Sequence, residues 1–175
     1  MQIYKKICKK LSNALDIEKL SDYNIHIIFY VKGFIFMAMN RRQAREAAFT
    51  LLFETEFHPE ESKEAIFALS VATREIAEEE YVKPAYFGVY SNLEEIDALI
   101  SKHAKGWKVS RISRVSRSIL RLAVFEMLYL EALPTSVSIN EAVELSKKFD
   151  EESARPFVNG VLNSVKNEIE GADNA

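Results

Sequence analysis

The chain has 175 residues, of which 48% are hydrophobic and 28% charged, a composition typical of a soluble globular protein with a sizeable core. Its formal net charge is −3, whereas a non-specific nucleic-acid binder is usually basic throughout. The single cysteine, Cys8, excludes an internal disulfide framework, and the three histidines are scattered singly. We therefore expect no metal, no cofactor and a reduced, cytoplasmic setting.

Residues 1–38 differ in composition from the rest of the chain. Ile, Lys, Asn, Tyr and Phe, which AT-rich codons encode, account for 21 of them, and arginine is absent before Arg41. The apolar stretch 25–39 is shorter than a membrane-spanning helix requires. We predict that 1–38 is a leader, either a start-site artefact or a disordered extension, that the domain covers 39–170, and that 171–175 is a polar tail. A targeting segment and an amphipathic surface helix remain alternatives.

Helical periodicity dominates from Asn40, which is expected to cap the first helix. That helix should end at His58-Pro59, since proline cannot continue the hydrogen-bond ladder. Its inward positions are predicted to be Ala44, Ala48, Leu51, Leu52 and Thr55. A second helix is expected after Ser62, and its apolar face should contain Ala65, Ile66, Leu69, Thr73 and Ile76.

The middle of the chain is predicted to contain one interrupted stretch and two helices. Pro84 and Gly88 are expected to break 78–91, and the next helix should run from Asn92 to Gly106. The stretch 115–133 is apolar almost all round, which places it at the centre of a bundle. Glu126 lies within it and must find a partner, for which Arg121 or the start of the following helix are the candidates.

Two more helices are predicted near the C-terminus. Pro134 should stop the long helix, and Ser138 with Glu141 has the spacing of a capping box. The last helix contains "RPFVNGVLNSV", in which Gly160 is expected because another segment approaches the backbone there. The sequence therefore predicts an all-α bundle of six or seven helices.

The residue types favour binding over catalysis. The chain lacks a nucleophile with an adjacent base, a glycine-rich phosphate loop and a carboxylate pair, so we do not expect an enzyme. Arg41, Arg42 and Arg45 occupy the first turns of the first helix, where basic charge opposes the helix dipole unless an anion is bound. Phe49 and Phe53 continue this face and could stack on bases or pack in the core.

A second basic series runs from Lys102 to Arg121 and includes Lys105, Lys108, Arg111, Arg114 and Arg117. Most of these side chains are expected to be solvated or paired with acidic neighbours. The pattern alone does not assign them to RNA.

Three motifs together resemble the NusB family of transcription antitermination factors. They are "NRRQAREAAFTLLFE", "SRSILRLAVFEMLYL" followed by "LPTSVSINEAVELSKKF", and "RPFVNGVLNSV". The resemblance covers the chain from Met39 or Asn40 to about Ile169. It implies a fold of six or seven helices in two packed halves, without catalytic activity.

The resemblance also implies a function and its residues. NusB proteins bind boxA-type single-stranded RNA of ribosomal RNA transcripts together with NusE, a ribosomal protein, and help load an RNA polymerase antitermination complex. The family's RNA-contacting role carries over to Arg41, Arg42 and Arg45, with Phe53 and Phe157 as further candidates. Two alternatives stay open, namely an RNA-recognition module of the rRNA methyltransferase type and a homodimeric interaction module.

Overall fold

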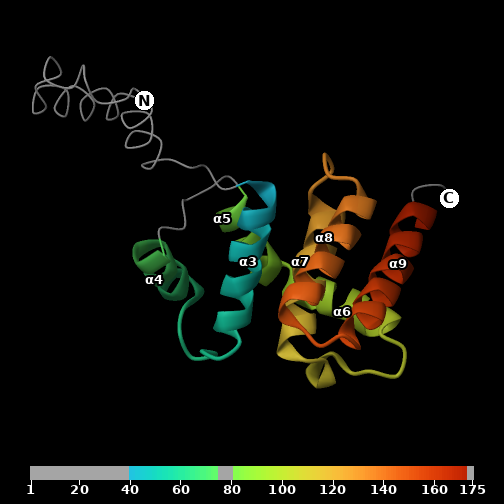
Figure 1. Cartoon of the computed structure of the whole chain (residues 1–175), viewed down its shortest axis with the longest axis horizontal. Coiled ribbons are helices and arrows are strands. Elements are labelled where there is room, and N and C mark those ends of the chain that lie inside the picture. The colour runs from blue at the N-terminus through green and yellow to red at the C-terminus, as the bar shows by residue number, and fades with distance from the viewer. Residues whose placement is uncertain (1–39, 75–80, 173–175) are drawn as a thin grey trace, which may run out of the picture. The chain divides into compact units, whose positions relative to one another are not determined.

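The computed structural model of the chain describes residues 40–74 and 81–172, and the predicted leader at 1–38 lies outside these ranges. The described residues form seven α-helices and one short 3₁₀ helix, η2, and contain no strand, so the all-α prediction is confirmed (Figure 1). The helices are α3 (Arg41–Thr55), α4 (Lys63–Arg74), α5 (Val82–Ser91), α6 (Leu93–His103), η2 (Val109–Arg111), α7 (Arg114–Tyr129), α8 (Thr135–Phe149) and α9 (Ala154–Ala172). Within those ranges, no helix is long and apolar enough to span a membrane.

The helices pack as two groups that meet at α7. In the first group α3 contacts both α4 and α5, and in the second α6, α8 and α9 surround α7 (Figure 1). Helix α7 also contacts α3 and α5, and its side chains from Ile119 to Met127 are buried, with the single exception of the half-buried Arg121. The prediction of a central helix is therefore confirmed, although it ends at Tyr129 rather than Leu133.

The start of α3 follows from its local sequence. The Asn40 side chain accepts a hydrogen bond from the Gln43 backbone N–H, and the Gln43 side chain accepts one from the Asn40 N–H, both at 2.9 Å. This capping box confirms Asn40 as the N-cap. All five positions predicted to face inward are buried.

Helix α4 begins as predicted but presents a different face to the core. The Ala65 backbone N–H donates to the Ser62 hydroxyl at 3.1 Å. Ile66 and Phe67 are buried, whereas Ala65 is exposed and Leu69 is 63% exposed. Of the predicted inward positions Ile66 is confirmed, Ala65, Leu69 and Thr73 are wrong because they are exposed, and Ile76 lies outside the described residues.

The predicted break over 78–91 is also wrong, because α5 is continuous from Val82 to Ser91. Pro84 lies in the first turn of α5, where a missing backbone N–H removes no intrahelical hydrogen bond. Gly88 lets α5 approach α7 closely, since a Cβ added there would lie 2.3 Å from a ring carbon of Phe125.

Two expectations in the C-terminal half are corrected. Helix α8 begins at Thr135 after Pro134, so Ser138 lies inside the helix and its buried hydroxyl has no hydrogen-bond partner among the described residues. It therefore cannot cap the helix. Gly160 is exposed, and a Cβ added there would meet nothing within 4 Å, so no close approach explains that glycine.

Candidate nucleic-acid interface

The N-terminal end of α3 presents two exposed arginines. Arg41 and Arg42 occupy the first turn, which contains no acidic residue. The Arg41 guanidinium carbon lies 5.8 Å from the ring centroid of Tyr81, and the Arg42 side chain is 62% exposed. Because the dipole of a helix favours negative charge at its N-terminus, this end of α3 is suited to an anion.

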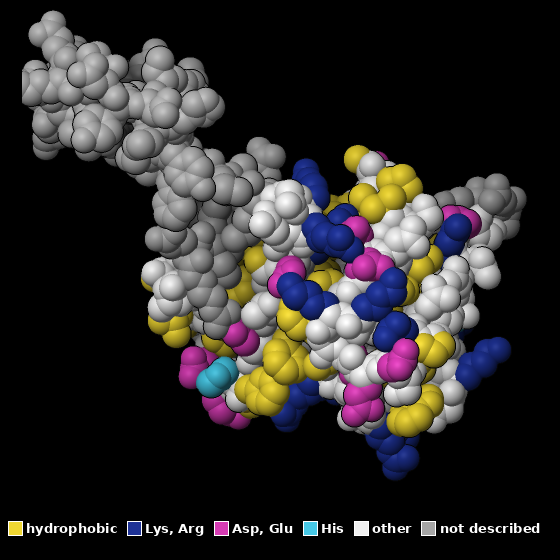
Figure 2. Space-filling model, in the orientation of Figure 1, with side chains coloured by type: hydrophobic (Ala, Val, Ile, Leu, Met, Phe, Trp, Pro, Cys, Tyr) yellow, Lys and Arg dark blue, Asp and Glu magenta, His cyan; other side chains and the backbone are white. Residues whose placement is uncertain are grey.

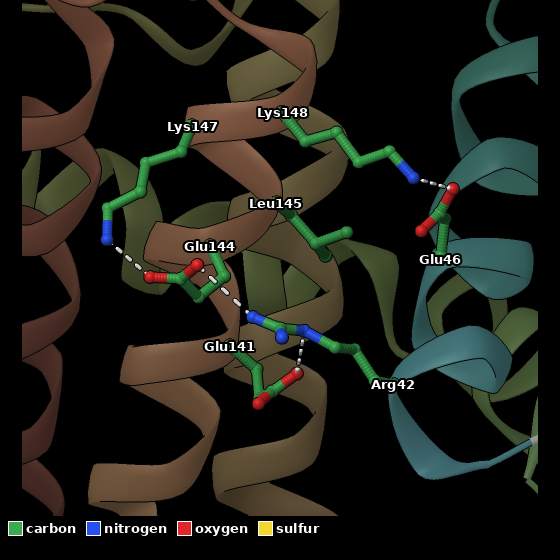
Figure 3. Close-up of a pocket in the computed structure, with 7 residues that line it drawn as sticks. All are labelled: Arg42, Glu46, Glu141, Glu144, Leu145, Lys147 and Lys148. Atoms are coloured by element: carbon green, nitrogen blue, oxygen red, sulfur yellow. Dashed lines mark hydrogen bonds and ion pairs between the residues drawn. The ribbon is translucent and has the colours of Figure 1, made fainter.

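A hollow of about 390 Å³ lies between α3 and α8, and Arg42 reaches across it (Figure 3). The Arg42 guanidinium lies 3.1 Å from a Glu144 carboxylate oxygen and 3.8 Å from one of Glu141. Further along the two helices, the Lys148 ammonium lies 2.5 Å from a Glu46 carboxylate oxygen. Leu145 and Lys147 complete the lining, and Lys147 donates to Glu144.

Cations and carboxylates alternate over this hollow, as the intermixed blue and magenta side chains of α3 and α8 show (Figure 2). The hydrogen bond from Lys147 and then the charges of Lys147 and Arg42 lower the pKa of Glu144. Ion pairs between exposed side chains are each worth about 0–1 kcal/mol, so a phosphate can replace these carboxylates as the partner of Arg42 at small cost. The cations and carboxylates that line the hollow are therefore equal in number, and the ion pairs of Arg42 can be exchanged for a phosphate.

Arg45 lies in a different environment from Arg41 and Arg42. It is 6% exposed, and its Nε donates to a carboxylate oxygen of Glu126, which is 1% exposed, at 2.6 Å. The Tyr81 hydroxyl donates to the same oxygen at 2.5 Å, and Glu141 lies 3.6 Å from the Arg45 guanidinium. Glu126 is paired as expected, but its partners are Arg45 and Tyr81, and the predicted partner Arg121 binds Asp97 and Glu56 instead.

The electrostatics of this buried group favour the ion pair. Burial alone would lower the pKa of Arg45, but the charge of Glu126 and its hydrogen bond raise it overall. Burial and the neighbouring Glu126 charge raise the pKa of Tyr81, so its hydroxyl keeps its proton and donates. Arg45 therefore joins α3 to α7 in the described structure.

Phenylalanines continue the face of α3 below the arginines. Phe49 is 3% exposed and packs in the core, with its ring centroid 4.9 Å from that of Phe149. Phe53 is half-buried between Phe49, at 6.1 Å, and Phe57, at 5.0 Å. Phe57 is 49% exposed. Of the two aromatic candidates on α3, only Phe53 reaches the surface.

Phe157 does not line the hollow. It lies in the first turn of α9 and packs against Trp107, with ring centroids 6.3 Å apart. The predicted residues therefore occupy four environments: Arg41 and Arg42 at the exposed start of α3, Arg45 in the core, Phe53 half-buried near the end of α3, and Phe157 at the start of α9.

The sequence interpretation missed the contribution of α8. Glu141, Glu144 and Lys148 follow one another at spacings of three and four residues, which places them on one face of a helix. This spacing of charged residues in the sequence indicates a charged helix face, but only the packing shows that the face lies opposite Arg42. In the part of the chain that the structure describes, no group of three His, Cys, Asp or Glu side chains could hold a metal ion.

The all-α fold and the arginines exposed at the start of α3 define a helical protein with a surface suited to anions. The NusB family model matches residues 42–167. Transcription antitermination protein NusB of Bacillus pumilus is 44% identical over 131 residues, which cover 75% of this chain and 98% of that protein. The Bacillus subtilis protein of the same name is 42% identical over 136 residues, with the same coverage. The chain belongs to the NusB family.

Solved structures agree with this assignment. T. maritima NusB is 36% identical, with a TM-score of 0.66 over 75% of this chain and 94% of that one. A structure described as antitermination factors NusB and NusE in complex with dsRNA is 32% identical, with a TM-score of 0.65 over 71% of this chain and 94% of that one. The predicted NusB-like fold is confirmed.

Proposed function

We propose that this protein is a non-catalytic transcription antitermination factor. In this proposal it binds boxA-type single-stranded RNA of ribosomal RNA transcripts together with NusE, as part of an RNA polymerase antitermination complex in the cytoplasm. Two comparisons support it, namely the relatives named transcription antitermination proteins and the structural neighbour that contains NusB and NusE in complex with dsRNA.

The observation that carries the proposal is the exposed pair Arg41 and Arg42 at the start of α3. Both side chains are exposed, and among the described residues the guanidinium of Arg42 forms ion pairs with the half-buried Glu141 and Glu144. A guanidinium can bind a phosphate, like a carboxylate, through two hydrogen bonds, so the phosphates of a bound strand can take the place of these glutamates. A strand bound here would exchange the contacts with Glu141 and Glu144 for contacts with phosphates.

We assign different roles to the remaining candidates. Phe53, half-buried beside the exposed Phe57, offers part of a stacking surface to a base. Arg45 acts on RNA through the position of α3, because its guanidinium is occupied by Glu126. Phe157 contacts RNA outside the hollow.

The proposal is tested by titrating a labelled boxA-type RNA with the protein, with and without NusE, at two salt concentrations. Arg41→Ala and Arg42→Ala should each weaken binding and reduce the salt slope by about 0.7. Lys102→Ala is the matched control, because Lys102 is also 62% exposed and paired with a glutamate, but on α6. Equal affinities of all variants, or no binding by the wild type, would refute the proposal.

The domain boundary forms part of the same proposal. We infer that 39–170 is sufficient for RNA binding, because the family match covers 42–167. The full chain and a chain that begins at Met39 should bind the RNA with the same affinity. A loss of binding in the shorter chain would assign a role to 1–38.

A further inference from the structure

The connector between α6 and α7, residues 104–113, carries cations without carboxylate partners in the described structure. Lys105, Lys108 and Arg111 are exposed and form no ion pair with a described residue. Other members of the same basic series are occupied, since Arg117 binds Glu56 and Lys102 binds Glu168. The expectation that these side chains are solvated or paired is therefore confirmed. The series has an exposed part in the connector and a part that is paired with glutamates.

Exposed aromatic rings flank these cations. Trp107 is 55% exposed, and its ring packs edge-on against Phe157. At the other end of the connector, the guanidinium carbon of Arg114 lies 4.4 Å from the ring centroid of the exposed Phe57. Gly106, with φ +81°, adopts the left-handed conformation that turns the chain between α6 and Trp107. We call Phe57, Lys105, Trp107, Lys108, Arg111 and Arg114 the connector patch.

Asp150 and Glu152, which follow α8, both have partners among the described residues. Asp150, which follows α8, accepts hydrogen bonds from the hydroxyls of Ser113 and Ser116 at 3.3 and 2.5 Å. Glu152 lies 3.4 Å from the guanidinium of Arg155. Dark-blue side chains protrude at the lower rim of the molecule, among hydrophobic and acidic ones (Figure 2). Hydroxyl partners leave the charge of Asp150 in place, but the four cations of the connector patch outnumber it and give this surface an excess of positive charge on a protein that is acidic overall.

Cations alternating with exposed rings match the chemistry of a single-stranded nucleic acid. Cations track the phosphates, and each ring can stack on an unpaired base, which a duplex would keep inside its own stack. A protein partner would need an acidic face that also offers an apolar site to Trp107, whereas every nucleotide of an RNA strand carries both a phosphate and a ring. Single-stranded RNA is thus the occupant that uses the whole patch.

We propose that the connector patch is a second contact surface for the RNA strand, one that binds nucleotides flanking the element held at the start of α3. This inference rests on the proposed function. Helix α3, with 15 residues, is about 22 Å long, and Phe53 and Phe57 lie at its far end, next to Arg114. A strand that follows α3 from Arg42 therefore reaches the connector patch.

The test uses the full chain and three boxA-type RNAs: the element alone, and the element extended by a run of uridines at one end or at the other. The wild type should bind one extended RNA at least about tenfold more tightly than the element alone. Lys108→Ala/Arg111→Ala should reduce this gain and leave the affinity for the element unchanged, and Trp107→Ala should also reduce the gain. The double variant should also reduce the salt slope for the extended RNA by about 1.4.

A double variant with the same loss of charge, Lys102→Ala/Lys166→Ala, is the matched control, because both of its lysines pair with glutamates of α9. It should keep the gain. If the wild type binds the element but gains nothing from either extension, or if the patch variants keep the gain, the inference is overturned and the proposed function stands. If the patch variants lose only affinity for NusE, the surface binds protein and the inference is also overturned. If the wild type binds no element, the proposed function fails and this inference fails with it.

Discussion

Replacing Arg45 by Met removes the charge that compensates Glu126 inside the protein. Methionine preserves most of the length of the side chain but leaves the Glu126 carboxylate, 1% exposed, with the Tyr81 hydroxyl as its one remaining side-chain partner among the described residues. Breaking a buried ion pair by removing one member typically costs about 3–5 kcal/mol, because the other charge remains buried. We expect Arg45→Met to lower the free energy of unfolding by that amount, measured by urea denaturation followed by circular dichroism.

Two further variants separate the charge from the packing. Glu126→Gln keeps an acceptor for Tyr81 and leaves Arg45 with Glu141 at 3.6 Å, so it should cost less than Arg45→Met. In the double variant Arg45→Met/Glu126→Gln no buried charge is left uncompensated, and its stability should exceed that of Arg45→Met. The double-mutant cycle then gives the coupling between the two side chains directly.

The same variants test whether Arg45 contacts RNA. If Arg45→Met is as stable as the wild type yet binds boxA-type RNA more weakly, the guanidinium acts on RNA directly and the structural role assigned here is wrong. If the stability falls and the RNA affinity of the folded fraction is retained, only Arg41 and Arg42 remain as direct contacts on α3.

Three other perturbations have distinct expected outcomes. Gly88→Ala should destabilise the protein by about 1–3 kcal/mol in urea denaturation, because its Cβ would lie 2.3 Å from the ring of Phe125; a stability equal to that of the wild type would contradict this close approach. Gly160→Ala, in a helix with nothing within 4 Å, should instead stabilise it by about 0.5–1 kcal/mol, and a loss would show that the site is crowded. Hydrogen bonds from Lys102 and then from His103 lower the pKa of Glu168, so its contribution to stability is present above about pH 4.5 and is lost as the pH falls through its lowered pKa. Acidification should therefore destabilise the wild type more than Glu168→Gln, and equal losses would show that this carboxylate contributes nothing.

Local sequence signals predicted where several helices begin, because caps depend on neighbouring residues. Asn40 and Ser62 accept the expected backbone hydrogen bonds. Packing partners depend on tertiary structure, and here the predictions were less accurate. Nothing in the sequence near Glu126 indicates that its partner is Arg45, 81 residues away, because the crossing of α3 and α7 decides which arginine reaches it.

The candidate site shows the same limit within one short motif. Arg42 and Arg45 are three residues apart, so their side chains leave α3 about 60° apart, close enough to be predicted on one face. That angle is nevertheless enough to direct Arg45 toward Glu126 on α7 and Arg42 toward Glu144 on α8. The buried pair fixes the rotation of α3, and this rotation brings the exposed Arg42 to the hollow. The motif thus contains a buried arginine, Arg45, that orients α3 and an exposed arginine, Arg42, that is a candidate RNA contact. Replacing Arg45 should weaken RNA binding only to the extent that α3 rotates about its axis.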